Sequence, residues 1–383
     1  MRRSIIGFMT GTSIDGLDAA LVRIDGRGLE MVATLVATVS RPLGELAEPL
    51  RAIAEQKPTT AFEIARIGRE FALLHAQAAS ELARMSTDPI DLIVVHGQTV
   101  FHQPPLSWQL MAPAPLAAAL DTPVLFDLRS ADLAAGGQGA PITPLADWVV
   151  FREAARTVAV VNIGGFVNYT LLPSGGGPGS VIAGDVCAGN HVLDVIARRS
   201  LGQPFDKDGA AALSGHVLND ALDDLLGVLA AQASGRRSLG TGDEVTSWLG
   251  RHRVGAEGLI SGADLAATAC EALGQTIAKV LMSHEHLPDV VLLAGGGALN
   301  RALVAAIQAS VSARVQTTAA RGVGVEAREA MHMAVLGALC VDGVAVTLPG
   351  VTGCGTAPLS GTLCPAPRGG GSVRWAYDPP RRD

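Results

Sequence analysis

Three short apolar runs, each followed by a glycine-rich loop, organise this chain. The runs cover residues 4–6, 158–161 and 290–293, and the loops read GFMTGTSIDG, NIGGFVN and AGGGALN. Short β-branched and apolar runs bounded by glycine predict strands. A strand that ends in glycines presents backbone N–H groups at the sheet edge, where no side chain blocks a phosphate. Three such loops predict a nucleotide held in a cleft from two sides.

The remaining pattern predicts one α/β unit that occurs twice. In the first third, strands are expected over 19–24, 31–38 and 91–95, with a long helix before the last of them. Its apolar face is formed by Ile64, Ile67, Phe71, Leu74, Ala78 and Leu82. From residue 158 the plan repeats, with strands over 167–172 and up to 183 and a helix over 190–199. Asn190 is its expected N-cap, and a second long helix is expected over about 264–282.

Length and composition predict a globular protein of two domains. At 383 residues the chain exceeds one comfortable core. We expect an N-terminal domain over 1–135 plus about 340–365, a second domain over 136–339, and a flexible tail over 366–383, which is rich in Pro, Gly and Arg.

Charge and cysteine usage limit the partners and the compartment. The net charge is −7 without a basic block, so nucleic acid is not an expected partner. No apolar run approaches the roughly 18 residues of a membrane span, and MRRSIIGFMTG lacks a cleavage site, so we expect neither membrane insertion nor a signal peptide. The five scattered cysteines favour a reducing cytoplasm. A homodimer is expected only as the commonest oligomer.

The first loop has the chemistry of a phosphate site. In GTSIDGLD, Gly11, Thr12, Ser13 and Gly16 can surround a terminal phosphate with N–H and hydroxyl donors, and Asp15 and Asp18 can hold magnesium waters or a substrate hydroxyl. The alternative is a plain hairpin turn, which Ile14–Asp15–Gly16 also favours. The chain has no GxxxxGK[ST] pattern, which argues against a P-loop NTPase.

Two further residues stand where a catalytic group is expected. Asp185, in AGDVCAGN, lies where the second meander meets its helix, a suitable position for a general base; a helix-capping role is the alternative. Glu329 begins the helix EAMHMAVLGAL, whose apolar face otherwise predicts core.

Two polar segments are candidates for binding a small substrate. HGQTVFH carries His96 and His102; a metal site is one interpretation, but hydrogen bonds to a polyhydroxylated ligand fit better, because no zinc set is complete nearby. FDLRSADLAAGGQGAP carries Arg129, which can pair with a substrate carboxylate; an interdomain hinge is the alternative.

The order of these motifs resembles the anhydro-N-acetylmuramic acid kinase family, within the sugar-kinase/actin/Hsp70 superfamily. The resemblance runs from residue 7 to about 365. It is carried by GFMTGTSIDGLDAALV, HGQTVFHQP, FDLRSADLAAGGQGAPITP, NIGGFVN, LGQPFDKDG, GGGALN, the segment around Glu329–Ala330, and LPGVTG.

This resemblance implies a fold, an activity and a set of site residues. The expected fold is α/β, with two duplicated actin-like (ribonuclease H-like) domains and a nucleotide cleft between them. The implied enzyme uses ATP and Mg²⁺ to convert 1,6-anhydro-N-acetylmuramic acid to N-acetylmuramic acid 6-phosphate, opening the anhydro ring with water during peptidoglycan recycling. Asp185 matches the catalytic aspartate. The nucleotide site matches Gly11, Thr12, Ser13, Ile14, Asp15, Gly16, Leu17, Asp18, Gly164, Gly165, Gly295, Gly296 and Gly297. The sugar site matches His96, Gln98, Thr99, Arg129 and Glu329. The metal ligands are not implied.

Two departures from the family pattern bear on activity. Where the family reads DTGPGN, this chain reads DVCAGN, and its STGRE-like stretch is replaced by SLGTGDE at 238–244. The bulkier Val186 and Cys187 beside the base indicate either a smaller or reshaped sugar pocket or a paralogue of reduced activity. Three hypotheses therefore stand: the anhydrosugar kinase, a kinase of another small sugar, and a non-catalytic nucleotide or sugar sensor.

Overall fold

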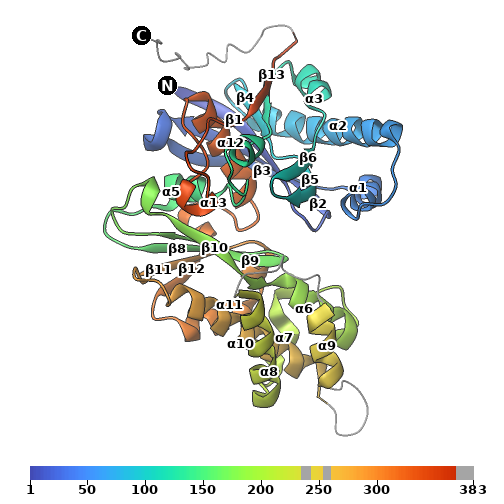
Figure 1. Cartoon of the computed structure of the whole chain (residues 1–383), viewed down its shortest axis with the longest axis vertical. Helices are drawn as coiled ribbons and strands as arrows, with labels where there is room; N and C mark the ends of the chain where they lie inside the picture. Colours follow the sequence, from blue (N-terminus) through green and yellow to red (C-terminus); the bar gives the residue numbers. More distant parts are fainter. Residues whose placement is uncertain (234–242, 253–259, 368–383) are drawn as a thin grey trace. The chain divides into compact units, whose positions relative to one another are not determined.

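The chain folds into two compact units (Figure 1). The computed structural model describes residues 1–233, 243–252 and 260–367. The first unit comprises Met1–Phe151, Gly177–Val181 and the segment from Ala327 onward, and the second comprises Arg152–Gly176 and Ile182–Glu326.

These limits differ from the expected boundaries at 135 and 340. Helix α5 (Pro144–Phe151) and helix α12 (Arg328–Val341) belong with the first unit. The physical reason is packing: α12 lies against the first sheet, and α5 packs on α12.

The first unit is built on a six-stranded sheet. Its order is β13-β7-β4-β1-β2-β3. The strands are β1 (Arg2–Thr10), β2 (Gly16–Asp25), β3 (Val32–Pro42), β4 (Leu92–Val95), β7 (Val124–Phe126) and β13 (Thr362–Cys364). Strands β1 to β3 form an antiparallel meander, whereas β4 is parallel to β1 and β7 is parallel to β4. A separate hairpin pairs β5 (Gln98–Gln103) with β6 (Leu106–Leu110).

The second unit repeats this arrangement in a five-stranded sheet. Its order is β10-β9-β8-β11-β12. The strands are β8 (Val158–Ile163), β9 (Phe166–Leu172), β10 (Ile182–Ala188), β11 (Val290–Ala294) and β12 (Arg314–Thr317). Again an antiparallel meander comes first, and the two later strands are parallel to its first strand. The repeated order confirms the predicted duplication and defines two ribonuclease H-like units.

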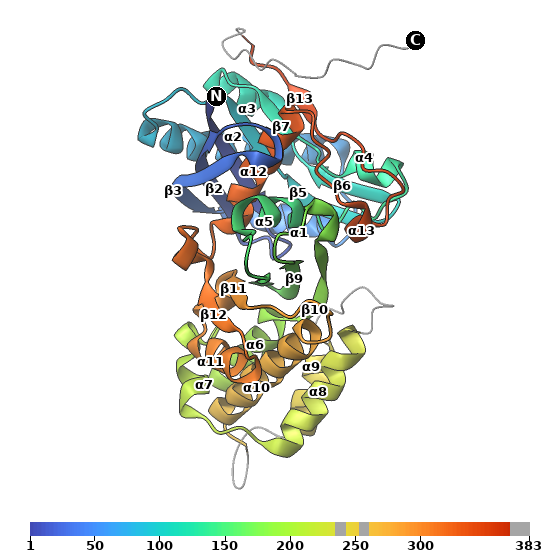
Figure 2. The same cartoon turned by 90° about the vertical axis from the view of Figure 1, so that its left-hand side faces the viewer.

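The helices cover these sheets. In the first unit they are α1 (Ala47–Ala54), α2 (Ala61–Met85), α3 (Pro113–Leu120), α4 (Ser130–Ala134), α5, α12 and α13 (Pro349–Thr352). In the second they are α6 (Asn190–Ile196), α7 (Ala210–Ser214), α8 (Asn219–Ala233), α9 (Asp243–Arg251), α10 (Gly262–Leu281) and α11 (Arg301–Ser310). Figure 2 shows α6–α11 gathered on one side of the second sheet.

The two long predicted helices are confirmed, and one predicted cap is wrong. Helix α2 begins with a capping box in which the Thr60 hydroxyl accepts from the Glu63 N–H, and its buried face includes Phe71. Asn190, in contrast, is the first residue of α6 rather than its N-cap; Gly189 takes that position, and the Asn190 side-chain amide donates to the Ile163 carbonyl at 3.4 Å.

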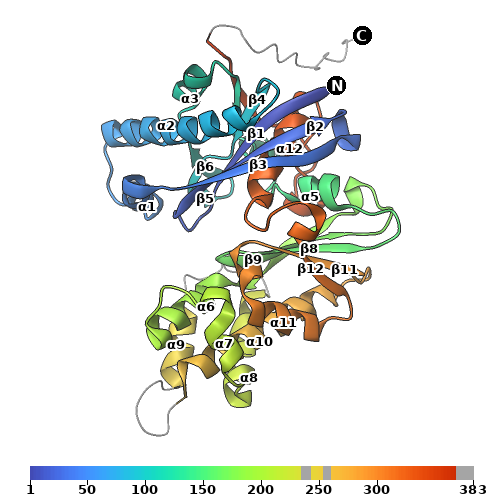
Figure 3. The ribbon, with the colours of Figure 1, turned by 180° about the vertical axis from the view of Figure 1, so that it is seen from behind.

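Helices α2 and α12 pack on opposite faces of the first sheet (Figure 3). Side chains alternate along β1, so Ile6 and Phe8 join the core that contains Phe71 of α2, while Gly7 faces α12. A Cβ built at Gly7 would overlap the Ala330 carbonyl oxygen. Only glycine therefore permits this close approach of helix and strand.

Two predictions fall largely outside the described residues. These are the SLGTGDE departure at 238–244 and the flexible tail at 366–383. Within the part of the chain that the structure describes, no helix has both the length and the apolar character needed to cross a membrane.

We predict that Gly7→Ala destabilises the first unit. The added methyl group overlaps backbone of α12, which cannot move aside like a flexible side chain, so the free energy of unfolding should fall by about 1–3 kcal/mol in urea titrations. Gly355→Ala is the matched control, because its Cβ would meet nothing within 4 Å. Equal stability of the two variants would contradict the close packing.

Candidate active site

Three parallel strands of the first unit end at the same edge of its sheet. The loop 11–15 follows β1, His96 follows β4, and Arg129 lies three residues after β7. Ligands of open α/β sheets bind beyond the carboxyl ends of parallel strands. The structure thus brings the predicted phosphate loop and most of the predicted sugar-binding residues together at one edge.

The predicted phosphate loop is also a hairpin turn, because β1 and β2 pair from Thr10 and Leu17 outward. Thr12 and Ser13 are exposed, and the Ser13 hydroxyl donates to the Asp15 carboxylate at 2.9 Å. Ile14 has a φ of 53°, a costly conformation for a β-branched residue, and its side chain is buried. Such strain often accompanies function. Ile14 and the buried Leu17 can offer a nucleotide only their backbone.

His96 serves Arg129 rather than facing a ligand. The Arg129 guanidinium donates to His96 Nε2 from Nε at 3.0 Å and from a terminal nitrogen at 2.9 Å. Nε2 must therefore lack a proton, so Nδ1 carries it and donates to the Gly97 carbonyl at 2.8 Å. Burial, with help from the Arg129 charge, lowers the His96 pKa to about 3, which keeps the ring neutral. His96 was expected to bond a ligand directly, but here it accepts hydrogen bonds from Arg129 instead.

Arg129 itself is fixed at two ends. Besides His96, its other terminal nitrogen donates to the Gly139 carbonyl at 2.6 Å. Burial lowers the Arg129 pKa to about 10, so the group stays cationic near neutral pH. The segment 126–141 lies wholly in the first unit, so it is not a hinge between the units. The remaining N–H donors of the guanidinium are suited to a carboxylate or a sugar oxygen.

Gln98 ties the polar segment to the phosphate loop. Its side chain is fully buried, and its amide donates to the Gly11 carbonyl at 3.2 Å and to the Thr99 carbonyl at 3.3 Å. Its oxygen Oε1 is buried without a partner in the described structure. Thr99 is partly exposed and accepts a long hydrogen bond from Gln109, so of these two residues it is the better placed to meet a substrate.

Glu329 lies in the first turn of α12, within electrostatic reach of Asp18 and Arg129. Burial raises the Glu329 pKa; Asp18 raises it further, and the Arg129 charge opposes the shift. The preceding residue, Arg328, is buried and forms a bidentate pair with Asp147 of α5, with one bond of 2.9 Å. This buried pair joins α12 to α5 directly beside Glu329.

Asp185 occupies a different position from the one expected. It lies inside β10, three residues before the strand ends, rather than where the strand meets the helix. It pairs with Asn168 of β9, and Asn168 pairs with Asn162 of β8, so the three side chains form a row on one face of the second sheet. Asp185 is exposed, yet desolvation by the surrounding protein raises its pKa. The sequence does carry a signal for the pair of Asn162 and Asn168, because NIGGFVN begins and ends with asparagine on either side of its glycine turn.

The DVCAGN departure is absorbed by the core. A β-bulge separates Asp185 from Cys187, and Val186, Cys187 and Ala188 all belong to the buried core of the second unit. Burial raises the Cys187 pKa to about 12, so its thiol stays protonated and unreactive. Their side chains pack inward, whereas Asp185 is exposed, so the altered side chains do not line the surface on which Asp185 lies.

The glycine loops of the second unit pack against one another. Asn190 N–H donates to the Gly164 carbonyl and Gly189 N–H donates to the Gly165 carbonyl, each at 2.8 Å. A Cβ at Gly297 would overlap the Ile163 side chain. Gly296, in contrast, is exposed. Packing thus explains several of these glycines, and Gly164 and Gly296 have the space that a phosphate or nucleoside needs.

The described residues do not form a dedicated metal cage. Among them no group of three or more His, Cys, Asp or Glu side chains could hold a metal ion. In HGQTVFH both His96 nitrogens have protein partners, and His102 Nδ1 lies 2.8 Å from the Ser107 hydroxyl.

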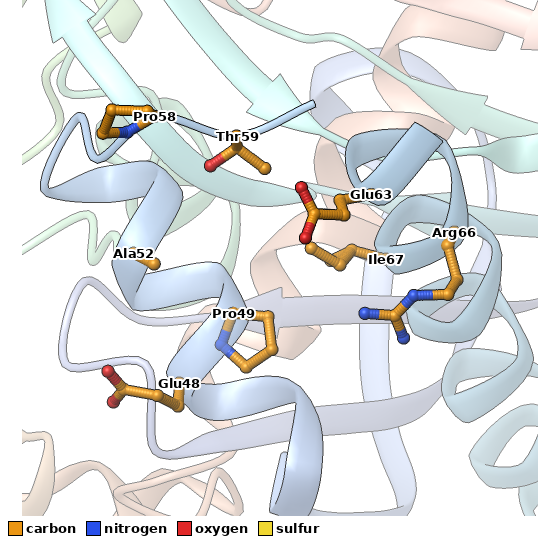
Figure 4. Close-up of a pocket in the computed structure, with 8 residues that line it drawn as sticks. All are labelled: Glu48, Pro49, Ala52, Pro58, Thr59, Glu63, Arg66 and Ile67. Carbon is orange, nitrogen blue, oxygen red and sulfur yellow. The ribbon is translucent and has the colours of Figure 1, made fainter. Parts of the chain in front are cut away.

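A surface hollow of about 250 Å³ lies between α1 and α2 (Figure 4). It is lined by Glu48, Pro49, Ala52, Pro58, Thr59, Glu63, Arg66 and Ile67. None of these residues was predicted to bind ligand.

Two ribonuclease H-like units with glycine loops at their strand ends define the class of actin-like ATPases and sugar kinases. A profile of the anhydro-N-acetylmuramic acid kinase family matches residues 3–366. The chain belongs to this family, and it is a kinase by that membership.

Named relatives support the same family assignment. The anhydro-N-acetylmuramic acid kinase of Gloeobacter violaceus is 36% identical over 374 residues, which cover 94% of this chain and 98% of the relative. That of Salinibacter ruber is 33% identical over 386 residues, covering 96% and 97%. Among solved structures, the ADPNP-bound activator of 2-hydroxyisocaproyl-CoA dehydratase from Clostridium difficile is similar over 87% of this chain and 93% of its own, with 13% identity and a TM-score of 0.43.

The buried neutral His96 predicts a pH dependence of stability. Its folded pKa of about 3 lies below the ordinary 6.5, so between these values the unfolded chain binds a proton that folded His96 does not. Stability is therefore full above pH 6.5 and is lost as the pH falls toward 3. Between pH 6.5 and 3, urea titrations should show that the free energy of unfolding falls less steeply in His96→Gln than in the wild type. The difference should be about 1.4 kcal/mol per pH unit.

His286→Gln is the control, because that residue is exposed. It should keep the dependence of the wild type. An unchanged slope in His96→Gln would show that His96 is protonated in the folded protein.

We predict that restoring the family threonine at Val186 lowers stability without raising kinase turnover. A hydroxyl in the fully buried site of Val186 should cost about 1–3 kcal/mol. Val32→Thr is the matched control, because Val32 is 62% exposed. A Val186→Thr protein of unchanged stability and higher turnover would mean that this side chain faces the substrate.

Proposed function

We propose that this protein uses ATP to phosphorylate 1,6-anhydro-N-acetylmuramic acid while water opens its anhydro ring. The product is N-acetylmuramic acid 6-phosphate, and the pathway is peptidoglycan recycling. The observation that carries the proposal is Asp185, an exposed carboxylate with a raised pKa, which the resemblance to the family matches to the catalytic aspartate.

The reaction needs one base and one acceptor of the phosphoryl group. Water attacks the anomeric carbon C1, and Asp185 takes a proton from that water as the new C–O bond forms. The bond between C1 and O6 breaks, and O6 attacks the γ-phosphorus of ATP, which releases ADP. The raised pKa makes Asp185 a stronger base than an ordinary aspartate.

Residues of the first unit would bind the two substrates. The backbone of the loop from Gly11 to Gly16 would donate hydrogen bonds to the phosphates, in the way that glycine loops bind anions. Arg129, held by His96 and Gly139, would bind the sugar together with Thr99. Glu329 would orient a sugar hydroxyl beside Arg129, because the two groups interact electrostatically.

The residues near Asp18 fit a magnesium ion that arrives with ATP. Asp18 and Glu329 are close enough for their like charges to raise the Glu329 pKa, and a divalent cation would relieve this repulsion. Mg²⁺ in kinases commonly uses one or two carboxylates, with phosphate oxygens and waters as the other ligands. Asp18, and Asp15 in the exposed turn, would hold the ion, which supplies charge neutralisation on the phosphates.

The alternatives are a kinase of another small sugar and a non-catalytic sensor. The altered DVCAGN and SLGTGDE segments support the sensor. Because the changed side chains of DVCAGN lie in the core, its part of that support is weaker, and catalysis is the better proposal.

The test is product mass after incubation with ATP, Mg²⁺ and 1,6-anhydro-N-acetylmuramic acid in isotopically labelled water. The expected product is heavier than the sugar by one phosphoryl group and one water, and the hydroxyl oxygen bonded to C1 carries the label. A gain of phosphate alone would indicate a conventional sugar kinase. ATP binding without product from this or related sugars would indicate a sensor.

We predict that Asp185→Asn retains ATP affinity but loses about a hundredfold to ten-thousandfold in turnover, because the general base is gone. Asp223→Asn, an exposed change on α8, should behave as the wild type. In the wild type, kcat/KM should fall as the pH decreases through the Asp185 pKa, above the ordinary value of 3.8. Equal turnover of Asp185→Asn and wild type would exclude Asp185 as the base.

A further inference from the structure

The LPGVTG segment, which the proposed mechanism leaves without a role, is joined to the Arg129 loop. Thr352, at the end of α13, is 1% exposed, and its hydroxyl donates to Asp132 Oδ1 at 2.8 Å. The Thr352 carbonyl also accepts from the Gln138 N–H at 2.8 Å. Two segments more than two hundred residues apart thus meet through one threonine.

Asp132 organises the glycine loop that follows α4. Its second oxygen, Oδ2, accepts from the Gly139 N–H at 2.8 Å. A Cβ at Gly137 would overlap this carboxylate, so the loop passes closely around it. The carbonyl of the same Gly139 accepts from Arg129 at 2.6 Å. A continuous chain of hydrogen bonds therefore runs from Thr352 through Asp132 and Gly139 to Arg129.

The chain of bonds is fully buried at Asp132 and partly buried at Arg129. Asp132 is fully buried, and burial alone would raise its pKa. Hydrogen bonds from Gly139, Thr352, Cys354 and Thr347 together outweigh that effect, so the pKa of Asp132 lies below its ordinary value and the group stays charged. A buried carboxylate must be fully hydrogen-bonded, so it holds its partners in fixed places.

We propose that Asp132 and Thr352 are positioning residues for the sugar site. Thr352 fixes the Asp132 carboxylate, which fixes Gly139, and the Gly139 carbonyl together with His96 directs the Arg129 guanidinium toward the sugar. This inference rests on the proposed function, in which Arg129 binds the sugar. It assigns a role in substrate affinity to residues that do not touch the substrate.

The test compares Thr352→Val, which loses the hydroxyl at nearly constant size, with Thr352→Ser, which keeps it. Thr352→Val should raise the KM for 1,6-anhydro-N-acetylmuramic acid about tenfold to a hundredfold, as expected when a hydrogen bond to a charged group is lost. The KM for ATP should stay unchanged, and Thr352→Ser should resemble the wild type. If Thr352→Val does not fold, Asp132→Asn replaces it, because it removes one acceptor at the same size.

A double-mutant cycle with Arg129→Lys identifies the route of the effect. If Thr352 acts through Arg129, Thr352→Val should add little to the sugar KM of the Arg129→Lys protein. Equal sugar KM values for Thr352→Val and Thr352→Ser, parallel increases for sugar and ATP, or full additivity with Arg129→Lys would each overturn the inference. An inactive wild type would instead refute the proposed function, so the two failures are distinguishable.

Discussion

The first unit depends on the close approach of α12 to β1 at Gly7. Because Gly7 has no side chain, the backbone of α12 can lie directly on the first strand, and its first turn reaches the carboxyl edge of the sheet. This contact brings Glu329 within electrostatic reach of Asp18, more than three hundred residues earlier in the chain. The buried pair of Arg328 and Asp147 holds the same turn from its other side. One packing constraint therefore determines both the boundary of the unit and the electrostatics of its edge.

Both units follow one structural rule with different chemistry. Each places its loops where parallel strands end, and each opens with an antiparallel meander. In the first unit that edge carries hydroxyl groups and paired ions, whereas in the second it carries closely packed glycines, with the row of Asp185, Asn168 and Asn162 on one face of the sheet. The duplicated scaffold thus carries the proposed binding residues in one unit and the proposed base in the other.

Two buried polar groups of the first unit, His96 and Asp132, each have partners on two sides. Burial and the Arg129 charge keep His96 neutral, so that one nitrogen accepts from Arg129 and the other donates to Gly97. Hydrogen bonds that include those from Gly139 and Thr352 keep Asp132 charged. Burial makes each of these groups costly unless it is paired, so the pairing fixes side-chain directions as well as charge states. Arg129 is aimed from both sides by groups that are themselves immobilised.

The sequence alone determined the strand and glycine loop that open each unit, the long helices and the internal duplication. Short β-branched runs before glycine loops and the apolar face of 61–85 predicted strands, a long helix and an internal duplication, because side-chain periodicity is a local property. It also singled out Arg129, Asp185 and the HGQT segment by residue type and motif order.

Only the tertiary structure decided how those side chains are used. Val186 and Cys187 point into the core because of a β-bulge, which no local pattern shows. His96 supports Arg129, α12 belongs to the first unit, and Thr352 reaches Asp132, since each of these contacts joins segments far apart in the chain. Such contacts depend on how the faces of separate elements pack, and that information is spread over the whole sequence rather than held in any one segment.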